Sequence, residues 1–367
     1  MRKSPVLILL TALLAAALFF AGRTPPENPV PDDQAIAEIA AASVAALQGA
    51  YPAENKGLVR RAAHAKPHGC VKATFEVDPD LPEDLRVGTF AQPGQRLKAV
   101  IRFSNSAFMP GPDAAPNGRG MAIKLIDADP DHADSARKNP PHDLLLINYP
   151  VYFLANIQDF LRFARAGAIM GDLEHARAYF LPGANPFDWR LRELAIVVRN
   201  ATRAIASPLR TDYFSMTPYA FGPGRAIKYA ASPCALTPAP APDEKDPDYL
   251  RKALTEELKN GPACFELFVQ ERTGDLPLDD TTRDWPETQS PMRRLGRIAI
   301  PAQDVAAAGR EVLCENLSYN AAQAPEALEP LGGVNLARIA LYRQASAYRF
   351  RRNGATPTDA AKAWDLF

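Results

Sequence analysis

Short segments in which apolar and polar residues alternate, or apolar residues run together, predict a chain rich in β-strands. In Leu97–Ser104, Ile101 and Phe103 alternate with Arg102 and Ser104, which places the two pairs on opposite faces of a strand. The strand-like segments are Cys70–Val77, Leu97–Ser104, Met121–Ile126, Leu144–Ile147, Thr211–Tyr219, Ala226–Ala231, Cys264–Glu271 and Leu295–Ile300. So many short strands predict a large antiparallel sheet or barrel.

Longer segments with apolar residues at helical spacing predict helices between and after these strands. They are a segment from Asp32 or Asp33 to Gly49, Asn156–Ala168, Gly171–Ser207 with a break around Pro182–Pro186, Asp248–Lys259, and Asn335–Arg349. A central helical insertion and a helical C-terminus, added to the strands, predict an α+β fold. Prolines are frequent in connections such as Leu236–Asp248, and Asp127–Pro141 is polar, so we expect long loops around the core.

The charge balance argues against one class of partner. The 367 residues carry 42 Lys+Arg and 42 Asp+Glu, so the formal net charge is zero. We therefore expect no nucleic-acid partner. Hydrophobic residues make up 47% of the chain, enough for a substantial core. No internal repeat or linker divides the sequence after residue 33, so we expect one core domain over residues 34–367.

The N-terminus predicts export. A basic start, Met1-Arg2-Lys3, precedes the uncharged run Pro5–Gly22, so residues 1–22 are either a signal peptide or a short inner-membrane anchor. Both alternatives place the rest of the chain in the periplasm. Residues 23–33 form a Pro-rich tether. The helix that follows is rich in alanine, so we expect it to pack closely on a neighbouring element, with a second subunit of a homo-oligomer as one option.

The four cysteines leave two alternatives open. Cys70, Cys234, Cys264 and Cys314 lie far apart and form no CxxC pair, which argues against a metal cluster. In an oxidising periplasm they can form two disulfides, but free buried thiols are equally compatible with the sequence.

One face of the C-terminal helix carries unexpected chemistry. Arg338, Tyr342, Ala345 and Arg349 have the spacing i, i+4, i+7 and i+11, which places them on one side of the helix. An arginine one turn before a tyrosine can stabilise the phenolate, and tyrosine is one of the few side chains that ligate haem iron. The alternative is an ordinary surface helix with Arg–Tyr contacts.

Another candidate is His64. It lies between Ala63 and Ala65, whose small side chains leave room for a large flat ligand, although an isolated histidine is more often a hydrogen-bonded core residue. His64 and His68 have the spacing of a helical metal pair, but Pro67 argues against a helix there and therefore against a zinc site.

Three polar residues at predicted strands also have two interpretations. Arg102 and Ser104 share one strand face, which either lines a polar-edged pocket or faces solvent. Asn148 closes an apolar strand, where its amide either satisfies a turn or is presented to a site.

These segments together resemble the haem catalases. The matching motifs are RAAHAKPHG followed by FEV, VIRFS, NGRGMAIKL, INYPVYF and RIALY, with Arg349 eleven residues after Arg338. They occur in the family's order and cover residues 61 to about 350. The chain is most similar to short catalase-related proteins that consist of the core alone. The resemblance implies an antiparallel barrel of eight strands with helices around it and a haem buried beside the barrel.

The resemblance also implies a role for each matching residue. Tyr342 would be the axial ligand of the iron of haem b, with Arg338 stabilising its phenolate. His64 would be the distal acid–base group, Asn148 its polar partner and Ser104 the hydroxyl that orients the imidazole.

The remaining roles concern the haem itself. Arg61, Arg102 and Arg349 would hold the haem propionates, and Phe160 would stack near the distal face. Because Arg61 and His64 are three residues apart, a bulge or bend must bring both to the haem. Arg343 replaces the proline that typically follows the tyrosine in large catalases, so the helix can continue.

The implied function is that of a haem peroxidase or catalase that decomposes hydrogen peroxide or organic hydroperoxides. The peroxidase activity would use a small-molecule electron donor. The long arms of large catalases are missing, so we expect a wider channel that admits organic hydroperoxides. The alternatives are an isomerase resembling allene oxide synthase, a haem-binding protein without catalysis, and a barrel without haem.

Overall fold

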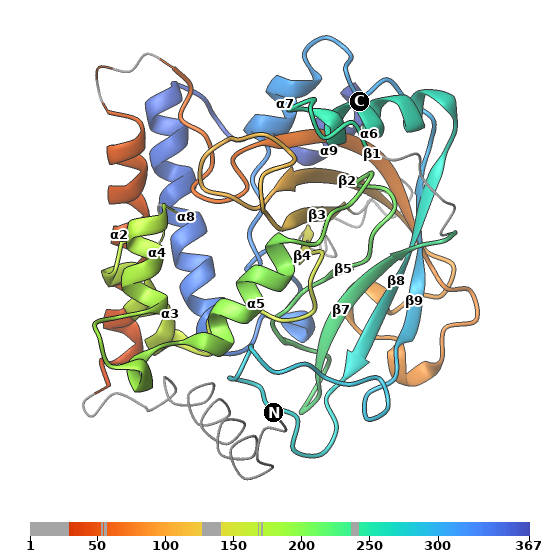
Figure 1. Ribbon diagram of the computed structural model, residues 1–367. Helices are drawn as coiled ribbons and strands as arrows, with labels where there is room; N and C mark the ends of the chain where they lie inside the picture. The colour runs from red at the N-terminus through yellow and green to blue at the C-terminus, as the bar shows by residue number, and fades with distance from the viewer. Residues whose placement is uncertain are drawn as a thin grey trace, which may run out of the picture.

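Nine antiparallel strands form the main structural unit, and eight of them close into a barrel (Figure 1). The computed structural model describes residues 29–52, 54, 57–126, 141–167, 169, 172–235 and 242–367. Within these ranges the strands are β1 Pro67–Val77, β2 Arg96–Asn105, β3 Arg119–Ile126, β4 His142–Ile147, β5 Tyr213–Phe214, β6 Tyr219–Ala220, β7 Ala226–Pro233, β8 Ala263–Glu271 and β9 Arg293–Ile300.

The barrel is closed by its shortest member. The strands run in the order β5-β4-β3-β2-β1-β9-β8-β7-β6, and β5 also pairs with β7. Phe214 of β5 lies opposite Ile147 of β4 on one side and Ala230 of β7 on the other. The predicted antiparallel barrel of about eight strands is therefore confirmed. The single strand expected at Thr211–Tyr219 is instead two two-residue strands, with Met216 between them at a φ of +62°.

Side-chain alternation separates the barrel core from its outer surface. Ile101 and Phe103 of β2 belong to the largest buried apolar cluster. Every barrel strand contributes to this cluster, and β5 does so through Tyr213. Arg102 and Ser104 point to the opposite face of β2, as their spacing predicts, but they too are buried. Something other than water must therefore cover this side of the barrel.

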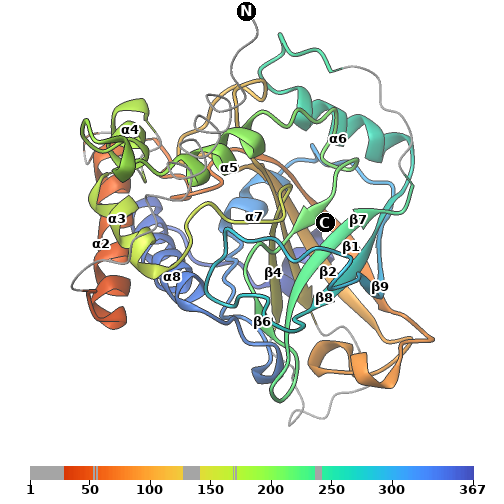
Figure 2. The same ribbon diagram turned by 60° about the horizontal axis from the view of Figure 1, so that its bottom comes forward.

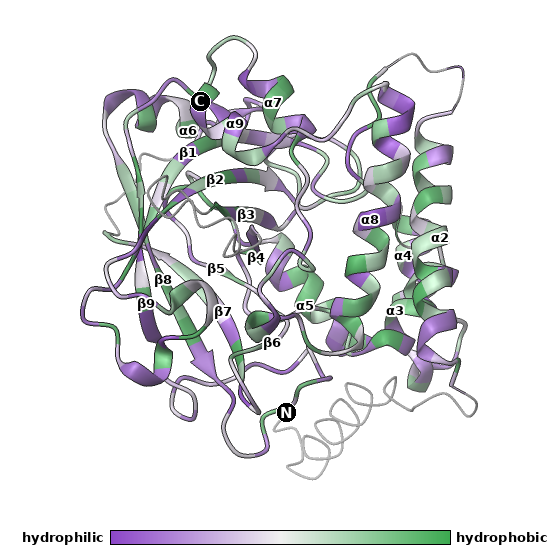
Figure 3. Cartoon of the chain, turned by 180° about the vertical axis from the view of Figure 1, so that it is seen from behind, coloured by the Kyte–Doolittle hydropathy of each residue, from purple (hydrophilic) through white to green (hydrophobic). Residues whose placement is uncertain are grey.

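Helices supply that cover. They are α2 Asp32–Ala50, α3 Ile157–Arg165, α4 Leu173–Phe180, α5 Leu191–Ala201, α6 Tyr249–Asn260, α7 Arg310–Asn316, α8 Gly333–Asn353 and α9 Ala360–Leu366. In two views, α2, α3, α4 and α8 stand together on one side of the barrel, while α6 lies elsewhere on it (Figures 1 and 2). Most of these elements mix hydrophobic and hydrophilic residues, as expected for layers that bury one face (Figure 3).

The alanine-rich helix α2 packs inside this chain. Ala35 and Ile39 of α2 share a buried cluster with Phe160 of α3 and with Ala337 and Leu341 of α8. Small alanine side chains allow this close approach between helices. The predicted close packing is therefore made with helices of the same chain, and a second subunit stays a prediction.

All four cysteines form disulfides. Cys70 of β1 pairs with Cys314 of α7, and Cys234, just after β7, pairs with Cys264 of β8. The alternative of free thiols is therefore wrong.

Some predictions fall partly or wholly outside the described residues. They concern the N-terminal segment 1–22, most of the tether 23–33, nearly all of the loop Asp127–Pro141 and the first part of the loop Leu236–Asp248. In the part of the chain that the structure describes, no helix is both long enough and apolar enough to cross a bilayer.

Candidate active site

A cavity of about 520 Å³ lies on the outer face of β2, β3 and β4, under α5 and α8. Ligand sites of small molecules and cofactors typically have volumes of this order. Its lining includes seven of the nine residues singled out in the sequence: Arg61, His64, Arg102, Ser104, Arg338, Tyr342 and Arg349. These residues come from three regions separated by up to 288 positions, so only the fold brings them together.

His64 is held in an unusual backbone conformation at the cavity wall. Its φ is +58°, in the left-handed region that residues other than glycine rarely adopt. The backbone N–H of His64 donates to the Ser106 carbonyl (3.2 Å), and the His64 carbonyl accepts from Arg102 Nη2 (2.7 Å). This turn is the bend that the spacing of Arg61 and His64 requires. Such local strain, held by hydrogen bonds, is typical of functional positions.

Contacts on one side of the ring orient the His64 imidazole. Nδ1 lies 3.0 Å from Ser104 Oγ, which leaves Nε2 as the nitrogen available to a ligand in the cavity. Gly120 of β3 lies against the same ring: a Cβ at this position would be 2.4 Å from His64 Nδ1. Burial, followed by the charges of Arg102, Arg338 and Arg61, lowers the pKa of His64 to about 3. The imidazole is therefore neutral at physiological pH and can accept a proton.

Three arginines meet at one end of the cavity. Arg61 Nη2 donates to the carbonyls of Cys314, Glu315 and Leu317, and Arg349 Nη1 donates to the Glu315 carbonyl. Each of the three guanidiniums keeps one buried nitrogen without a hydrogen-bond partner among the described residues: Nε of Arg61, Nε of Arg102 and Nη2 of Arg349.

Charge at this end is unbalanced. Glu315 is the carboxylate that contacts Arg349, at 3.4 Å, and it also lies 3.6 Å from Arg60. Burial and the charge of Arg61 lower the pKa of Arg102 to about 9 and that of Arg349 to about 10. Unpartnered donors with excess positive charge are what a buried ligand with carboxylates requires.

At the other end, α8 presents the arginine–tyrosine pair. Arg338 Cζ lies 5.8 Å from the centre of the Tyr342 ring, and Arg338 Nη1 donates to Thr217 Oγ1 (3.0 Å) and Asn335 Oδ1 (3.1 Å). Burial alone would lower the pKa of Arg338, but the nearby phenols of Tyr342, Tyr219 and Tyr152 raise it overall. The guanidinium is therefore fixed beside the Tyr342 ring, whose oxygen is a possible ligand for a metal ion.

Two predicted residues do not line the cavity. Asn148 is fully buried in the turn after β4, where its Oδ1 accepts from the Arg119 N–H (2.7 Å) and its Nδ2 lacks a partner among the described residues. Phe160 belongs to the apolar face of α3 that packs on α2 and α8, so its side chain is used in the helical core. Tyr152 and Phe153 line the cavity instead, and the Tyr152 ring centre lies 6.0 Å from Arg338 Cζ.

The sequence analysis missed several residues of the site. Thr217 and Asn335 hold Arg338, and Gly120 packs on the His64 ring. Asn335, three residues before Arg338 on the same helix, could have been found by its spacing. The contribution of α5, which includes Ile196 and Asn200, gave no signal, because it depends on how that helix docks on the barrel.

Comparisons with known proteins find relatives of one kind. No family model matches the chain. A catalase-related peroxidase from Mycolicibacterium paratuberculosis is 29% identical over 225 residues, which cover 58% of this chain and 65% of that protein. Catalase-2 from Bacillus subtilis is 25% identical over 272 residues, which cover 67% of this chain and 38% of that protein. The chain therefore spans less than two thirds of the length of either relative.

Solved structures show the same fold. A fungal catalase superposes with a TM-score of 0.65 at 20% identity, over 84% of this chain and 63% of the other. Catalase A from Saccharomyces cerevisiae gives a TM-score of 0.62 at 19% identity, over 81% of this chain and 62% of the other. The closed barrel and the cavity on its outer face thus define a protein of the catalase fold. The sequence similarity to a catalase-related peroxidase and to catalases supports the same superfamily.

Proposed function

We propose that this protein binds haem b between His64 and Tyr342 and decomposes hydrogen peroxide or organic hydroperoxides. The observation that supports this most directly is that His64, Tyr342 and the arginines line one cavity. The donor set fits the cofactor: Tyr342 offers an oxygen ligand for iron, and Arg61, Arg102 and Arg349 offer unpartnered N–H groups for the two propionates.

Each residue has a role that follows from its surroundings. When bound, the haem iron supplies the redox centre at which the O–O bond of a peroxide is cleaved. His64 Nε2 accepts the proton of the incoming peroxide and returns it to the departing oxygen, while Ser104 Oγ keeps the ring in place through Nδ1. Arg338, beside the Tyr342 ring, would offset the negative charge of an oxygen ligand to iron. In the peroxidase reaction, a small-molecule donor supplies the electrons.

The compartment is part of the proposal. The apolar segment 5–22 supports export to the periplasm, with cleavage or anchoring both open. The pairing of all four cysteines in disulfides supports the same compartment, because disulfides persist where the environment is oxidising.

Absorption spectroscopy of the full chain, expressed with a haem supply, tests this function. We expect a high-spin ferric spectrum with a Soret band that changes on addition of peroxide. We also expect oxygen evolution from hydrogen peroxide, or consumption of an alkyl hydroperoxide with an added donor. Protein without a Soret band would contradict the cofactor assignment. A rearranged lipid hydroperoxide formed without donor consumption would instead support an isomerase.

The pH dependence of the reaction with peroxide tests the state of His64. With a pKa of about 3, the imidazole keeps its neutral, proton-accepting form throughout the range from about pH 8 to about pH 5. We therefore expect a nearly constant second-order rate constant in stopped-flow experiments over this range. For an ordinary histidine with a pKa near 6.5, the neutral fraction of the imidazole would fall roughly 30-fold by about pH 5. A decline of that size would show that the ring is not buried as described.

Replacing Gly120 with alanine tests the packing on the imidazole. The added Cβ would be 2.4 Å from His64 Nδ1 and 3.0 Å from Ser104 Oγ, so we expect the ring to shift. We expect the rate of reaction with peroxide to fall about tenfold or more, since misplacing a catalytic group by about 1 Å is costly. Gly111→Ala is the control, because a Cβ at that position meets nothing within 4 Å. Equal rates for both variants would argue against a positioned imidazole.

A further inference from the structure

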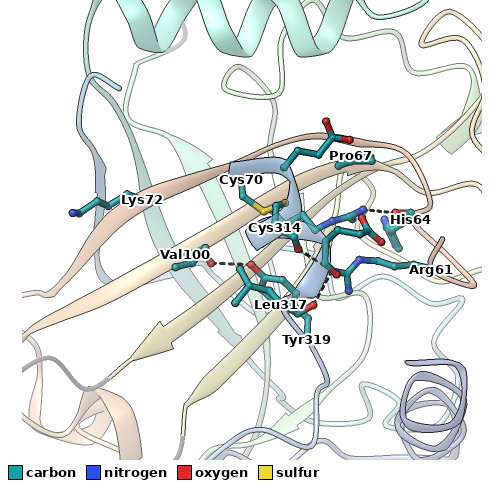
Figure 4. The surroundings of a disulfide bond; sticks show 12 residues. Arg61, His64, Pro67, Cys70, Lys72, Val100, Cys314, Leu317 and Tyr319 are labelled. Carbon is teal, nitrogen blue, oxygen red and sulfur yellow. Dashed lines mark hydrogen bonds between the residues drawn. A yellow bond between two sulfur atoms is a disulfide. The ribbon is translucent and has the colours of Figure 1, made fainter. Parts of the chain in front are cut away.

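The disulfide between Cys70 and Cys314 lies near Arg61, one of the arginines that line the cavity (Figure 4). Cys70 of β1 is the direct cross-strand partner of Arg102 of β2. Cys314 lies in the last turn of α7, and its own carbonyl accepts a hydrogen bond from Arg61. The disulfide thus joins the strand pair that carries one cavity arginine to the helix end that holds the other two.

The end of α7 is the element that fixes Arg61 and Arg349. The carbonyls of Cys314, Glu315 and Leu317 lie 3.1, 3.2 and 2.8 Å from Arg61 Nη2, and the Glu315 carbonyl lies 2.7 Å from Arg349 Nη1. Carbonyl groups at a helix C-terminus lack intrahelical partners and carry partial negative charge, so they bind cations well. The position of these carbonyls therefore decides where the two guanidiniums lie.

Packing alone gives α7 little anchorage. The helix has seven residues, and its buried ones are Arg310, Cys314 and Glu315. The one apolar residue among these three is Cys314, which forms the disulfide. Val312, another apolar residue of α7, is 63% exposed and so adds little to the packing. Ionic contacts and the covalent bond to β1 therefore hold this helix in place more than burial of an apolar face does.

We propose that the Cys70–Cys314 disulfide is a positioning element for the recognition of carboxylates in the cavity. It fixes the α7 carbonyls against β1 and β2, so that Arg61, Arg102 and Arg349 direct their unpartnered N–H groups at one dianionic ligand. The inference rests on the proposed function, in which that ligand is haem and the recognised groups are its propionates. Neither cysteine touches the ligand in this account, because both act through the arginines.

The test compares haem with its dimethyl ester, in which both propionates are uncharged. The full-length apoprotein with Cys70→Ala and Cys314→Ala is titrated with each ligand by Soret absorbance. Wild-type protein and the matched variant with Cys234→Ala and Cys264→Ala, which removes the other disulfide, serve as references. We expect haem affinity to fall about tenfold or more, as for other groups that orient ligand-binding residues, with the affinity for the diester within about twofold of wild type. The reference variant should leave both affinities unchanged.

Other outcomes would overturn the proposal in distinguishable ways. Equal loss of affinity for both ligands, or the same loss in the reference variant, would mean that the disulfide acts only on general stability. Unchanged haem affinity in a variant with wild-type circular dichroism would remove the positioning role. A wild-type protein that binds neither ligand would contradict the proposed function itself.

Folding of the double variant need not limit the experiment. In the reference variant, Cys70–Cys314 is the one remaining disulfide, and a phosphine reductant converts it to two thiols while the phosphine is oxidised. Loss of haem affinity without loss of diester affinity after this treatment supports the proposal. Retention of haem affinity after complete reduction, measured by thiol titration, overturns it.

Discussion

Tyr342→Phe is expected to abolish the haem spectrum or to shift it strongly. We also expect haem affinity to fall on the order of 100-fold or more, because residues that only orient a metal ligand already contribute about 10–100-fold to metal affinity. Phenylalanine keeps the ring but removes the oxygen that would bind iron. Arg338 retains its hydrogen bonds to Thr217 and Asn335, so the surrounding structure should be preserved. Soret titration of the apoprotein measures the loss, and thermal unfolding verifies the fold.

A second tyrosine on the same helix provides the control for Tyr342. Tyr348 is buried in a neighbouring apolar cluster and does not line the cavity. Tyr348→Phe should therefore bind haem with wild-type affinity and with an unchanged spectrum. If Tyr342→Phe behaves in the same way, Tyr342 is not the iron ligand, and the proposed orientation of the haem fails.

Much of this site could be predicted because regular spacing survives folding. Arg338, Tyr342, Ala345 and Arg349 all line the cavity, since an α-helix keeps residues at these intervals on one face whatever it packs against. The same holds for Arg102 and Ser104, where the period of two along a strand is fixed by backbone geometry.

The features that escaped prediction depend on contacts between distant segments. The left-handed backbone of His64 is stabilised by Ser106 and Arg102, which lie far along the chain, and nothing in the local sequence requires it. Phe160 shows the converse: its helix was predicted, but its side chain packs between α2 and α8 and does not line the cavity. Helix α7 has too few residues to give a periodic pattern, although its carbonyls fix two arginines of the site.

The cysteines illustrate the same limit. Cys70 and Cys314 are separated by 244 positions, and their pairing depends on α7 lying against β1. Spacing along the chain contains no information about that contact. The two disulfides that the sequence allowed are confirmed, but the choice between paired and free thiols required the fold.

Removal of the imidazole should separate catalysis from haem binding. Because His64 has a φ of +58°, alanine at this position adds backbone strain of about 1 kcal/mol or more. Asparagine tolerates the left-handed region better and can still contact Ser104, but it cannot exchange protons near neutral pH. We therefore expect His64→Asn to bind haem with the wild-type spectrum, since Tyr342 is untouched. We expect its reaction with peroxide to be slower by about 10²–10⁴-fold, the usual contribution of general acid–base catalysis.

The comparison that decides the role of His64 uses both variants and an exposed histidine. His175 pairs with Asp172 on α4 and does not line the cavity, so His175→Ala should react at the wild-type rate. A slow His64→Ala with a fast His64→Asn would mean that the bend at residue 64 matters and the proton acceptor does not. If both variants react as fast as wild type while keeping haem, the cavity binds haem without using the imidazole. The protein would then be a haem carrier or sensor, because His64 would take part in no step of the reaction with peroxide.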